Sequence, residues 1–253
     1  MLPRFVETVG TLEPSAHPGA CHEQLPNGRT NVVFRVLEEG QRGDLCIVGP
    51  RTRAVFKDAS GISRALIVRL KPGWSGSLLG IGANVLRDRI VHLEDIWGRP
   101  GRDLLEALLA TPTLTEALDK LSHAIALRAG DTFEPASAHL ARQAARLFEA
   151  DEVRVERVAE RLGVTARHLR RVFVESVGVT PKDFARGVRL QRALRMAATS
   201  RDWSRIAADA GYYDQAHLIG DFRELIGSTP DAFARARAST TTDAHRFGAG
   251  ILK

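Results

Sequence analysis

The feature that most constrains the fold of this chain is a segment that occurs twice. Residues 174–187 read VESVGVTPKDFARG and residues 223–236 read RELIGSTPDAFARA, so seven of the fourteen positions are identical. In each copy a glycine stands two residues before a Thr-Pro pair. Glycine favours the left-handed backbone that ends a helix, whereas threonine caps a new helix and proline suits its first position. The repeat therefore predicts a helix end followed at once by a helix start, at two places in one chain.

The similarity extends upstream of each copy, where residues 157–184 and 205–233 align with a one-residue insertion. In the first unit Gly163 suits a helix end and Thr165 suits the next helix start. Apolar residues of that next helix recur at helical spacing, as Leu169, Val172 and Phe173. Each unit therefore reads as helix–turn–helix, and a long helix over about residues 182–197 is expected to join the two.

A helical-repeat solenoid also repeats pairs of helices with glycine between them, but such arrays need three or more repeats. A helix–turn–helix of this size is one of the standard ways to place a helix in the major groove of DNA. A solvated surface helix normally mixes charge signs. The helix at about residues 166–176 does not, because its outward face carries Arg167, His168, Arg170 and Arg171. This face favours the DNA-binding interpretation.

Positive charge is concentrated in the same region. Nine basic and two acidic residues lie between positions 161 and 195, against five basic and six acidic residues between positions 196 and 238. The whole chain carries a net charge of +6, with a pI of about 9.9. A basic surface of this kind attracts the phosphate backbone of nucleic acids. The first unit and the joining helix are therefore expected to face DNA.

These residues resemble the C-terminal DNA-binding domain of the AraC/XylS family of bacterial transcription regulators. The resemblance covers about residues 153–236 and is carried by AERLGVTARHLRRVF in the first unit and IAADAGYYDQAHLIGDFRELIGSTPDAF in the second. It implies a sequence-specific activator or repressor whose recognition helices, about residues 166–176 and 214–225, enter successive major grooves. His168 and His217 occupy equivalent positions before a leucine, where either a base contact or local packing accounts for them. The side chains expected at the DNA are Arg167, His168, Arg170, Arg171, Arg189, Asp214, Gln215, His217, Ile219 and Gly220.

The second unit departs from the family pattern at Gly220, where the family commonly has an arginine. Glycine removes a cation and costs roughly 1 kcal/mol of helix propensity against alanine, and Asp221 beside it would repel phosphate. We therefore expect the second unit to contribute less to DNA affinity than the first. Tyr212 and Tyr213 are expected to pack at the turn, and Arg186 is expected to be a solvated surface charge.

The N-terminal half has a different pattern of apolar and polar residues. Apolar and β-branched runs bounded by Gly, Asp and Asn predict strands, and apolar residues at helical spacing predict two helices after them. The expected strands cover residues 31–37, 44–49 and 62–70, and the expected helices cover residues 103–110 and 113–129. The fold class is therefore expected to be α+β: a strand-rich N-terminal domain with two helices, followed by an all-α C-terminal domain.

This half also resembles an uncharacterised (DUF6597-like) domain that accompanies a subset of AraC/XylS regulators. The segments that carry this resemblance are LPNGRTNVVFRV, GPRTRAVF, VRLKPGWSGSLLG and LRDRIVHLEDIWG. The expected organisation is an effector-binding or dimerisation domain at residues 1–130, a linker at 131–138, the double helix–turn–helix domain at 139–238 and a flexible tail at 239–253.

The effector site and the partners are less constrained. Trp74, in the glycine-rich stretch at residues 73–82, and the pair Cys21 and His22 are candidate effector contacts, with a plain loop and ordinary packing as the alternatives. The leucine-rich faces of the two predicted helices form either a dimer seam or part of the core. Besides double-stranded DNA, the expected partners are a small-molecule effector, a second copy of the chain and RNA polymerase. The alternative is an N-terminal protein-interaction module without a small ligand.

The sequence contains no motif of an enzyme active site, a cofactor or a metal site, so a non-enzymatic regulator is expected. The alternative from another class is a DNA-alkyl-transfer protein with an AraC-like module, which would need a reactive cysteine and a four-cysteine zinc cluster. This chain has two cysteines. Its N-terminus has no signal-peptide pattern, and no apolar run approaches the ~20 residues of a membrane-spanning helix. We therefore expect a cytoplasmic, nucleoid-associated protein without membrane contact.

Overall fold

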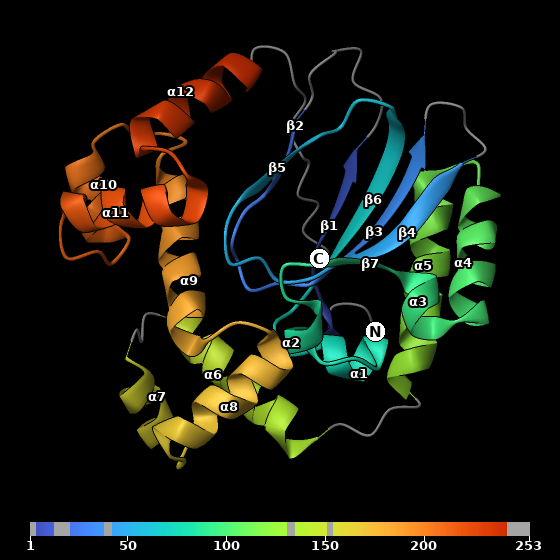
Figure 1. Ribbon diagram of the computed structural model, residues 1–253, viewed down its shortest axis with the longest axis horizontal. Helices are drawn as coiled ribbons and strands as arrows, with labels where there is room; N and C mark the ends of the chain where they lie inside the picture. Colours follow the sequence, from blue (N-terminus) through green and yellow to red (C-terminus); the bar gives the residue numbers. More distant parts are fainter. Residues whose placement is uncertain (1–3, 13–20, 38–41, 131–134, 151–153, 242–253) are drawn as a thin grey trace.

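A strand-rich N-terminal half and a helical C-terminal half make up the molecule (Figure 1). The computed structural model describes residues 4–12, 21–37, 42–130, 135–150 and 154–241. Within these residues every strand precedes Leu93. The arrangement confirms the predicted α+β fold class. In the described part of the chain, no helix combines the length and the apolarity needed to cross a lipid bilayer.

The N-terminal half is centred on a five-stranded antiparallel sheet in the order β1-β6-β3-β4-β7. Its strands are β1 (Val6–Leu12), β3 (Asn31–Leu37), β4 (Gly43–Val48), β6 (Ile62–Leu70) and β7 (Ile90–His92). The three predicted strands are confirmed as β3, β4 and β6, which occupy the centre of the sheet and are its most apolar members. The outer strands β1 and β7 have mixed or very short sequences, so their periodicity gave little signal.

A separate two-stranded ribbon lies between this sheet and the C-terminal helices (Figure 1). It consists of β2 (Cys21–Gln24) paired antiparallel with β5 (Val55–Asp58). Glu23 is the partner of Phe56, and Gln24 is the partner of Val55. Successive residues of a strand point to opposite faces, so the ribbon presents one set of side chains to the sheet and another to the helices.

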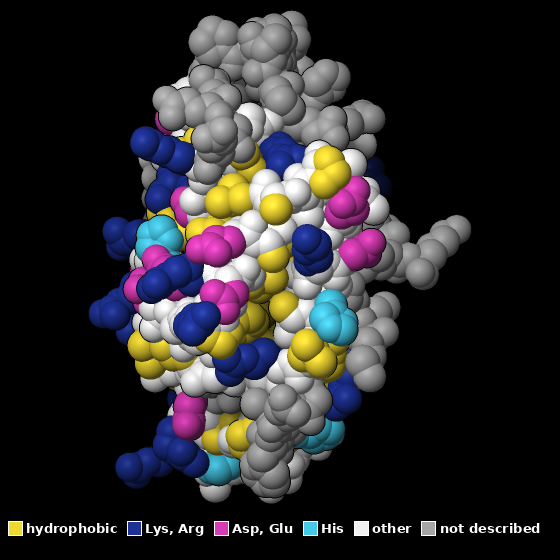
Figure 2. All heavy atoms as spheres, turned by 90° about the vertical axis from the view of Figure 1, so that its right-hand side faces the viewer, with side chains coloured by type: hydrophobic (Ala, Val, Ile, Leu, Met, Phe, Trp, Pro, Cys, Tyr) yellow, Lys and Arg dark blue, Asp and Glu magenta, His cyan; other side chains and the backbone are white. Residues whose placement is uncertain are grey.

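Helices cover the other face of the sheet. Those predicted from the sequence are confirmed as α4 (Arg99–Leu109) and α5 (Leu114–Gly130), and the Thr113 hydroxyl accepts a hydrogen bond from the Glu116 N–H at 3.2 Å at the start of α5. Three of their apolar side chains are at most 1% exposed and belong to the core under the sheet, namely Leu108, Leu121 and Ile125. Core packing therefore accounts for these positions. Figure 2 views this side of the molecule, where basic and acidic side chains surround a strip of apolar ones.

Three short helices connect the sheet to α4: α1 (Ser75–Leu79), α2 (Ala83–Leu86) and α3 (Leu93–Trp97). Helix α1 occupies the middle of the glycine-rich stretch at residues 73–82. The plain-loop interpretation of that stretch is therefore wrong for these five residues.

The C-terminal half contains two helix–turn–helix units joined by one long helix. Its elements are α7 (Val155–Arg161) and α8 (Ala166–Val177), the joining helix α9 (Pro181–Met196), α10 (Trp203–Asp209) and α11 (Gln215–Ile226), then α12 (Pro230–Thr241). Helices α8 and α11 end on Gly178 and Gly227, both in the left-handed conformation. Thr180 then caps α9, because its hydroxyl accepts a hydrogen bond from the Asp183 N–H at 3.1 Å. The predicted helix stops and starts are confirmed.

Helix α6 (Ala136–Glu149) precedes the first unit and packs on it. Its Phe148 ring meets Phe173 of α8 edge-on, with the ring centroids 5.6 Å apart. The helix begins inside the segment predicted as a linker, so residues 136–138 are helical, whereas residues 131–134 lie outside the described part of the chain. Of the predicted tail, residues 239–241 belong to α12 and the remainder is likewise outside it.

The two halves are packed together through the loop between β2 and β3. Arg29 on this loop forms ion pairs with Glu7 of β1 at 2.8 Å and with Glu149 of α6 at 2.6 Å. On α9, a Cβ at Gly187 would lie 3.2 Å from the carbonyl oxygen of Pro26. A side chain there would require Pro26 to move by a few tenths of an ångström, so glycine favours this close approach. The N-terminal half therefore holds the helix that joins the two helix–turn–helix units.

Candidate DNA-binding surface

Helix α8 exposes the basic side chains that the sequence placed on a recognition helix. The helix begins at Thr165, whose hydroxyl accepts a hydrogen bond from the His168 N–H at 3.2 Å. Its inner face is fully buried in the core shared with α6 and α9, through Leu169, Val172 and Phe173. Its outer face is exposed to solvent, with Arg167, His168, Arg170 and Arg171. The structure therefore gathers these four predicted residues on one accessible surface.

The contacts of these side chains are weak and exchangeable. Arg170 pairs with Glu156 of α7 at 2.5 Å, and Arg171 pairs with Glu175 one turn along α8 at 3.6 Å. Both pairs are more than half exposed, and such pairs contribute at most about 1 kcal/mol. Arg167 makes no hydrogen bond or ion pair within the described part of the chain. Phosphate groups could therefore replace the present partners at little cost.

Helix α11 has a different character. Asp214 caps it, with its carboxylate accepting a hydrogen bond from the His217 N–H at 2.7 Å. Gln215 accepts a hydrogen bond from the Ser204 hydroxyl at 2.8 Å, and its amide nitrogen remains on the exposed face. Ile219 is half-buried, and Gly220 is exposed with nothing within 4 Å of where its Cβ would be. The surface of α11 is accordingly open but carries less positive charge than α8.

The two tyrosines before α11 are separated by the structure. Tyr212 is buried, and its ring meets the His217 ring edge-on at 5.2 Å between centroids. This confirms packing for Tyr212 and gives His217 a local partner. Tyr213 is 93% exposed, so packing was the wrong expectation for it. Tyr213 lies next to the start of α11 with its side chain in solvent, a difference from Tyr212 that the paired sequence Tyr-Tyr did not reveal.

Arg189 and Arg186 do not belong to the exposed surface. Both side chains are 13% exposed and lie between α9 and α11, where Arg186 bonds Asp221 at 2.9 Å and Arg189 approaches the other Asp221 oxygen at 3.7 Å. Arg186 also bonds Glu224 at 2.6 Å, and the Arg189 guanidinium lies 5.3 Å from the centre of the Tyr212 ring. The expectations of a DNA contact for Arg189 and a solvated Arg186 are corrected here: burial against an acidic partner holds both arginines inside.

This cluster also corrects the role expected of Asp221. Its side chain is 7% exposed and its charge is balanced by two arginines, so it does not project toward phosphate. Hydrogen bonding to Glu224 raises the pKa of Arg186 further above its ordinary value, and the same bond lowers the pKa of Glu224. Burial, reinforced by Asp221, raises the pKa of Tyr212. The contacts of Arg186 with Asp221 and Glu224 join α9 to α11.

The predicted effector contacts do not meet in one place. Trp74 is buried between Phe5, at 4.7 Å between ring centroids, and the guanidinium of Arg142 on α6, at 4.0 Å from its ring. It therefore belongs to the contact between the two halves. The side chains of Cys21 and His22 lie outside the described part of the chain. A cavity does exist between the sheet and the ribbon, and Trp74 does not line it, whereas the strand that contains Cys21 and His22 belongs to its ribbon wall.

Cys46 and His92 form the one arrangement among the described residues that resembles a nucleophile beside a base, with Sγ and Nδ1 3.5 Å apart. Burial, followed by the nearby Asp44 carboxylate, raises the pKa of the Cys46 thiol to about 11. A catalytic cysteine needs a lowered pKa. The described residues also contain no group of three or more His, Cys, Asp or Glu side chains that could hold a metal ion. The requirements of an alkyl-transfer site are not met by these residues.

We expect Cys46 to resist alkylation at neutral pH. In a Cys21→Ser variant, iodoacetamide should modify the remaining thiol on the order of a hundredfold more slowly than free cysteine, because thiolate is the reactive form. The rate should rise with pH toward about 11, since the raised pKa keeps the thiol protonated below that value. Mass spectrometry of timed samples measures the rate, and the same variant in urea provides the unfolded control. Modification at the speed of free cysteine in the folded protein would contradict the expectation.

Comparison with known proteins agrees with this architecture. Residues 158–236 match the family model of a helix-turn-helix domain, of the AraC type, and residues 1–92 match that of a domain of unknown function, DUF6597. Among solved structures, ToxT from Vibrio cholerae at 1.65 Å resolution is 11% identical, with 90% of this chain and 98% of that chain covered and a TM-score of 0.49. ToxT with a bound unsaturated fatty acid, from Vibrio cholerae strain SCE256, is 13% identical, with 91% and 94% covered and a TM-score of 0.43.

No curated protein sequence matches the chain. The two family matches lie on the two halves that the fold separates, one on the strands and one on the paired helix–turn–helix units. The chain therefore combines a domain of the DUF6597 type with a helix–turn–helix domain of the AraC type that follows it.

Proposed function

We propose that α8 and α11 enter successive major grooves on one side of a DNA duplex. The observation that carries this proposal is the outer face of α8, where four basic side chains are exposed above a fully buried apolar face. Helix α9 between the two units has 16 residues and is therefore about 24 Å long. This length is shorter than the ~34 Å between successive major grooves on one side of a duplex, so the turns at the two ends of α9 must supply the remaining separation.

The two helices differ in what they can recognise. Arginine binds guanine through two hydrogen bonds in the major groove, so Arg167, Arg170 and Arg171 supply base readout and phosphate contacts on α8. On α11 the Gln215 amide suits adenine, and Tyr213 suits the sugar–phosphate backbone. We therefore assign most of the affinity to the first unit and a positional role to the second.

The N-terminal half is proposed to sense a small-molecule effector. The cavity beside the ribbon supports this role, because ligand sites are typically concave, mostly apolar and lined by a few polar groups. Dimerisation, if it occurs, needs a surface other than the buried leucines of α4 and α5.

The test is capture of genomic fragments by the full-length protein, with footprints mapped at about 50 mM and about 200 mM salt. We expect one footprint of about 20 base pairs that covers two major grooves on the same side of the duplex. Affinity should fall steeply with salt, because arginine contacts release counterions from the phosphates. Salt-sensitive capture without a preferred site would contradict sequence-specific readout by two helices.

Replacement of Gly220 by arginine should strengthen DNA binding. The position is exposed, and no atom lies within 4 Å of where an added Cβ would be. Arginine there adds a cation at the expected DNA face, so we expect affinity to rise several-fold and the salt slope to steepen by about one. The control is Gly220→Ala, which gains helix propensity of about 0.5–1 kcal/mol but no charge. Weaker binding by the arginine variant, with the alanine variant unaffected, would mean that DNA approaches the glycine closely.

A further inference from the structure

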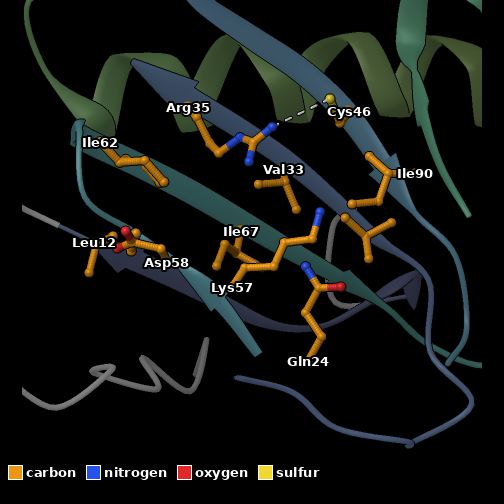
Figure 3. A pocket seen from close by; sticks show the side chains of 13 residues that line it. Leu12, Gln24, Val33, Arg35, Cys46, Lys57, Asp58, Ile62, Ile67 and Ile90 are labelled. Carbon is orange, nitrogen blue, oxygen red and sulfur yellow. Dashed lines mark hydrogen bonds between the residues drawn. The ribbon is translucent and has the colours of Figure 1, made fainter. Parts of the chain in front are cut away.

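The cavity lies between the central sheet and the ribbon and holds about 540 Å³ of space, including its mouth (Figure 3). Its floor is formed by branched apolar side chains of the sheet: Val33, Val48, Ile67 and Ile90. The ribbon forms the opposite wall, with Gln24 from β2 and Lys57 from β5. The site is therefore concave, with an apolar floor and a wall that carries polar groups, as is usual for small-molecule sites.

The polar groups that point into this space are donors. Figure 3 shows the Lys57 side chain reaching over Ile67 toward the interior, with the Gln24 amide beside it. Lys57 makes no hydrogen bond or ion pair within the described part of the chain. The Gln24 oxygen accepts a hydrogen bond from Arg51 Nε at 3.1 Å. This contact fixes the amide orientation and leaves its NH₂ group free to donate.

The acidic side chains around the cavity are already engaged. Arg35, which lines the cavity, donates a hydrogen bond to each oxygen of the Asp44 carboxylate. Its Nε does so at 2.8 Å, and its Nη2 binds the other oxygen. The carboxylate of Asp58 accepts hydrogen bonds from Ser60, at 2.8 Å from the N–H and 2.7 Å from the hydroxyl. Asp58 lies beside Leu12, away from the Lys57 ammonium group (Figure 3), and no described cavity residue forms an ion pair with Lys57. An apolar cavity with an unbalanced ammonium group favours an anionic occupant.

We infer that this cavity binds a small molecule with an apolar body and one negatively charged group. The body lies on the branched side chains of the sheet, and the charged group accepts hydrogen bonds from the Lys57 ammonium and the Gln24 NH₂. A neutral analogue leaves the ammonium unpaired, and a cationic analogue meets repulsion. The site thus selects for negative charge while tolerating variation in the apolar body.

The ribbon also connects this site to the second helix–turn–helix unit. Glu23 of β2 pairs with Arg237 of α12 at 3.4 Å, and the Phe56 ring lies 6.4 Å from Phe233. The Ala54 N–H donates a hydrogen bond to the Leu225 carbonyl of α11 at 2.7 Å. A ligand that draws Lys57 toward the sheet therefore pulls on strands that contact α11 and α12. This consequence rests on the proposed function, and it makes ligand and DNA binding thermodynamically coupled.

The ligand site is tested on the full chain by calorimetry with three compounds that share one body: 4-butylbenzoate, 4-butylbenzyl alcohol and 4-butylbenzylamine. We expect the benzoate to bind about tenfold or more tightly than the other two. Lys57→Glu should reverse the preference in favour of the amine, and Lys57→Met should abolish the difference between acid and alcohol. The control is Lys120→Glu, which makes the same charge change on the exposed side of α5. Circular dichroism confirms that each variant is folded.

Equal affinity for the three compounds, no binding of any of them, or an unchanged preference in folded Lys57 variants would overturn the ligand assignment. Coupling is measured separately, as the affinity for a captured DNA fragment with and without saturating 4-butylbenzoate. We expect the dissociation constant to change about fivefold or more, and Phe56→Ala to reduce that change while ligand affinity persists. An unchanged DNA affinity would overturn the coupling alone. Failure of the ligand-free and ligand-bound protein to bind any fragment would refute the proposed function and leave the ligand result standing.

Discussion

Alanine in place of Arg171 is expected to weaken binding to the operator by about 5- to 150-fold, which corresponds to ~1–3 kcal/mol for a bidentate base contact. The side chain is exposed in the middle of α8, and its pairing with Glu175 at 3.6 Å is too exposed to hold it in place. The loss should include specificity at one base pair if Arg171 binds guanine. It should instead lower the salt slope by about one if Arg171 contacts phosphate. Fluorescence anisotropy over a salt series separates the two.

Arg99→Ala is the matched control, because Arg99 is also an exposed arginine with an acidic partner one turn along its helix, and it lies on α4, on the side of the sheet away from the ribbon. Its removal should leave affinity and salt slope unchanged apart from the long-range effect of one charge. An Arg171→Ala protein with unchanged affinity would remove this residue from the DNA surface and would favour Arg167, which has no partner in the described part of the chain.

Loss of the Asp221 carboxylate is expected to have the largest effect on stability. Asp221→Ala leaves Arg189 largely buried without its acidic partner, and breaking such a buried pair from one side costs about 3 kcal/mol or more. Arg186 retains Glu224, so the two arginines should not be affected equally. Urea unfolding followed by circular dichroism measures the change in the free energy of unfolding.

Glu224→Ala provides the comparison within the same cluster. Glu224 binds the same arginine, but its side chain is 56% exposed against 7% for Asp221. Solvent screens an exposed pair, so its loss should cost less than about 1 kcal/mol. Similar losses for the two variants would show that burial does not set the strength of this cluster. We also expect Asp221→Ala to weaken DNA binding more than Glu224→Ala, because the freed α11 would lose its fixed angle to α9.

The helix–turn–helix units were predictable because their signals are local. The Gly178 and Thr180 positions, and their counterparts in the second unit, specify helix ends and starts within three residues of sequence. The buried face of α8 follows from apolar spacing alone, and the outward basic face follows from the positions that remain. The structure needed only to confirm how these elements are placed in space.

The arginine–aspartate cluster was not predicted because its partners are more than thirty residues apart and meet only through packing of α9 on α11. A signal did exist. Asp221 falls in the apolar stripe of α11, one turn from Leu218 and beside Phe222, where an acidic residue must be buried with a partner. Read in this way, the stripe would have placed Asp221 inside the protein and directed attention to the arginines of α9.

The ribbon and the cavity beside it could not be predicted from the sequence, for a different reason. Each strand has only four residues, and neither the sequence Cys-His-Glu-Gln of β2 nor Val-Phe-Lys-Asp of β5 alternates polar with apolar side chains. Neither face of the ribbon is uniformly apolar, so the sequence shows no alternation of apolar residues that would identify these two strands. In the sequence, Lys57 and Phe56 look like adjacent surface residues. In the structure, Lys57 lines the cavity and Phe56 lies against Phe233 of α12.

The contact between the N-terminal half and α9 limits which changes in the length of α9 related chains can tolerate. One residue inserted into a helix shifts all residues beyond it by about 1.5 Å and turns them by about 100°. Such an insertion would rotate α11 away from its groove and displace either Gly187 from Pro26 or Arg186 from Asp221. Substitutions on the outer faces of α8 and α11 disturb neither contact. Under the proposed DNA-binding mode, we therefore expect related chains to differ in the bases they recognise but to keep the same number of base pairs between the two half-sites.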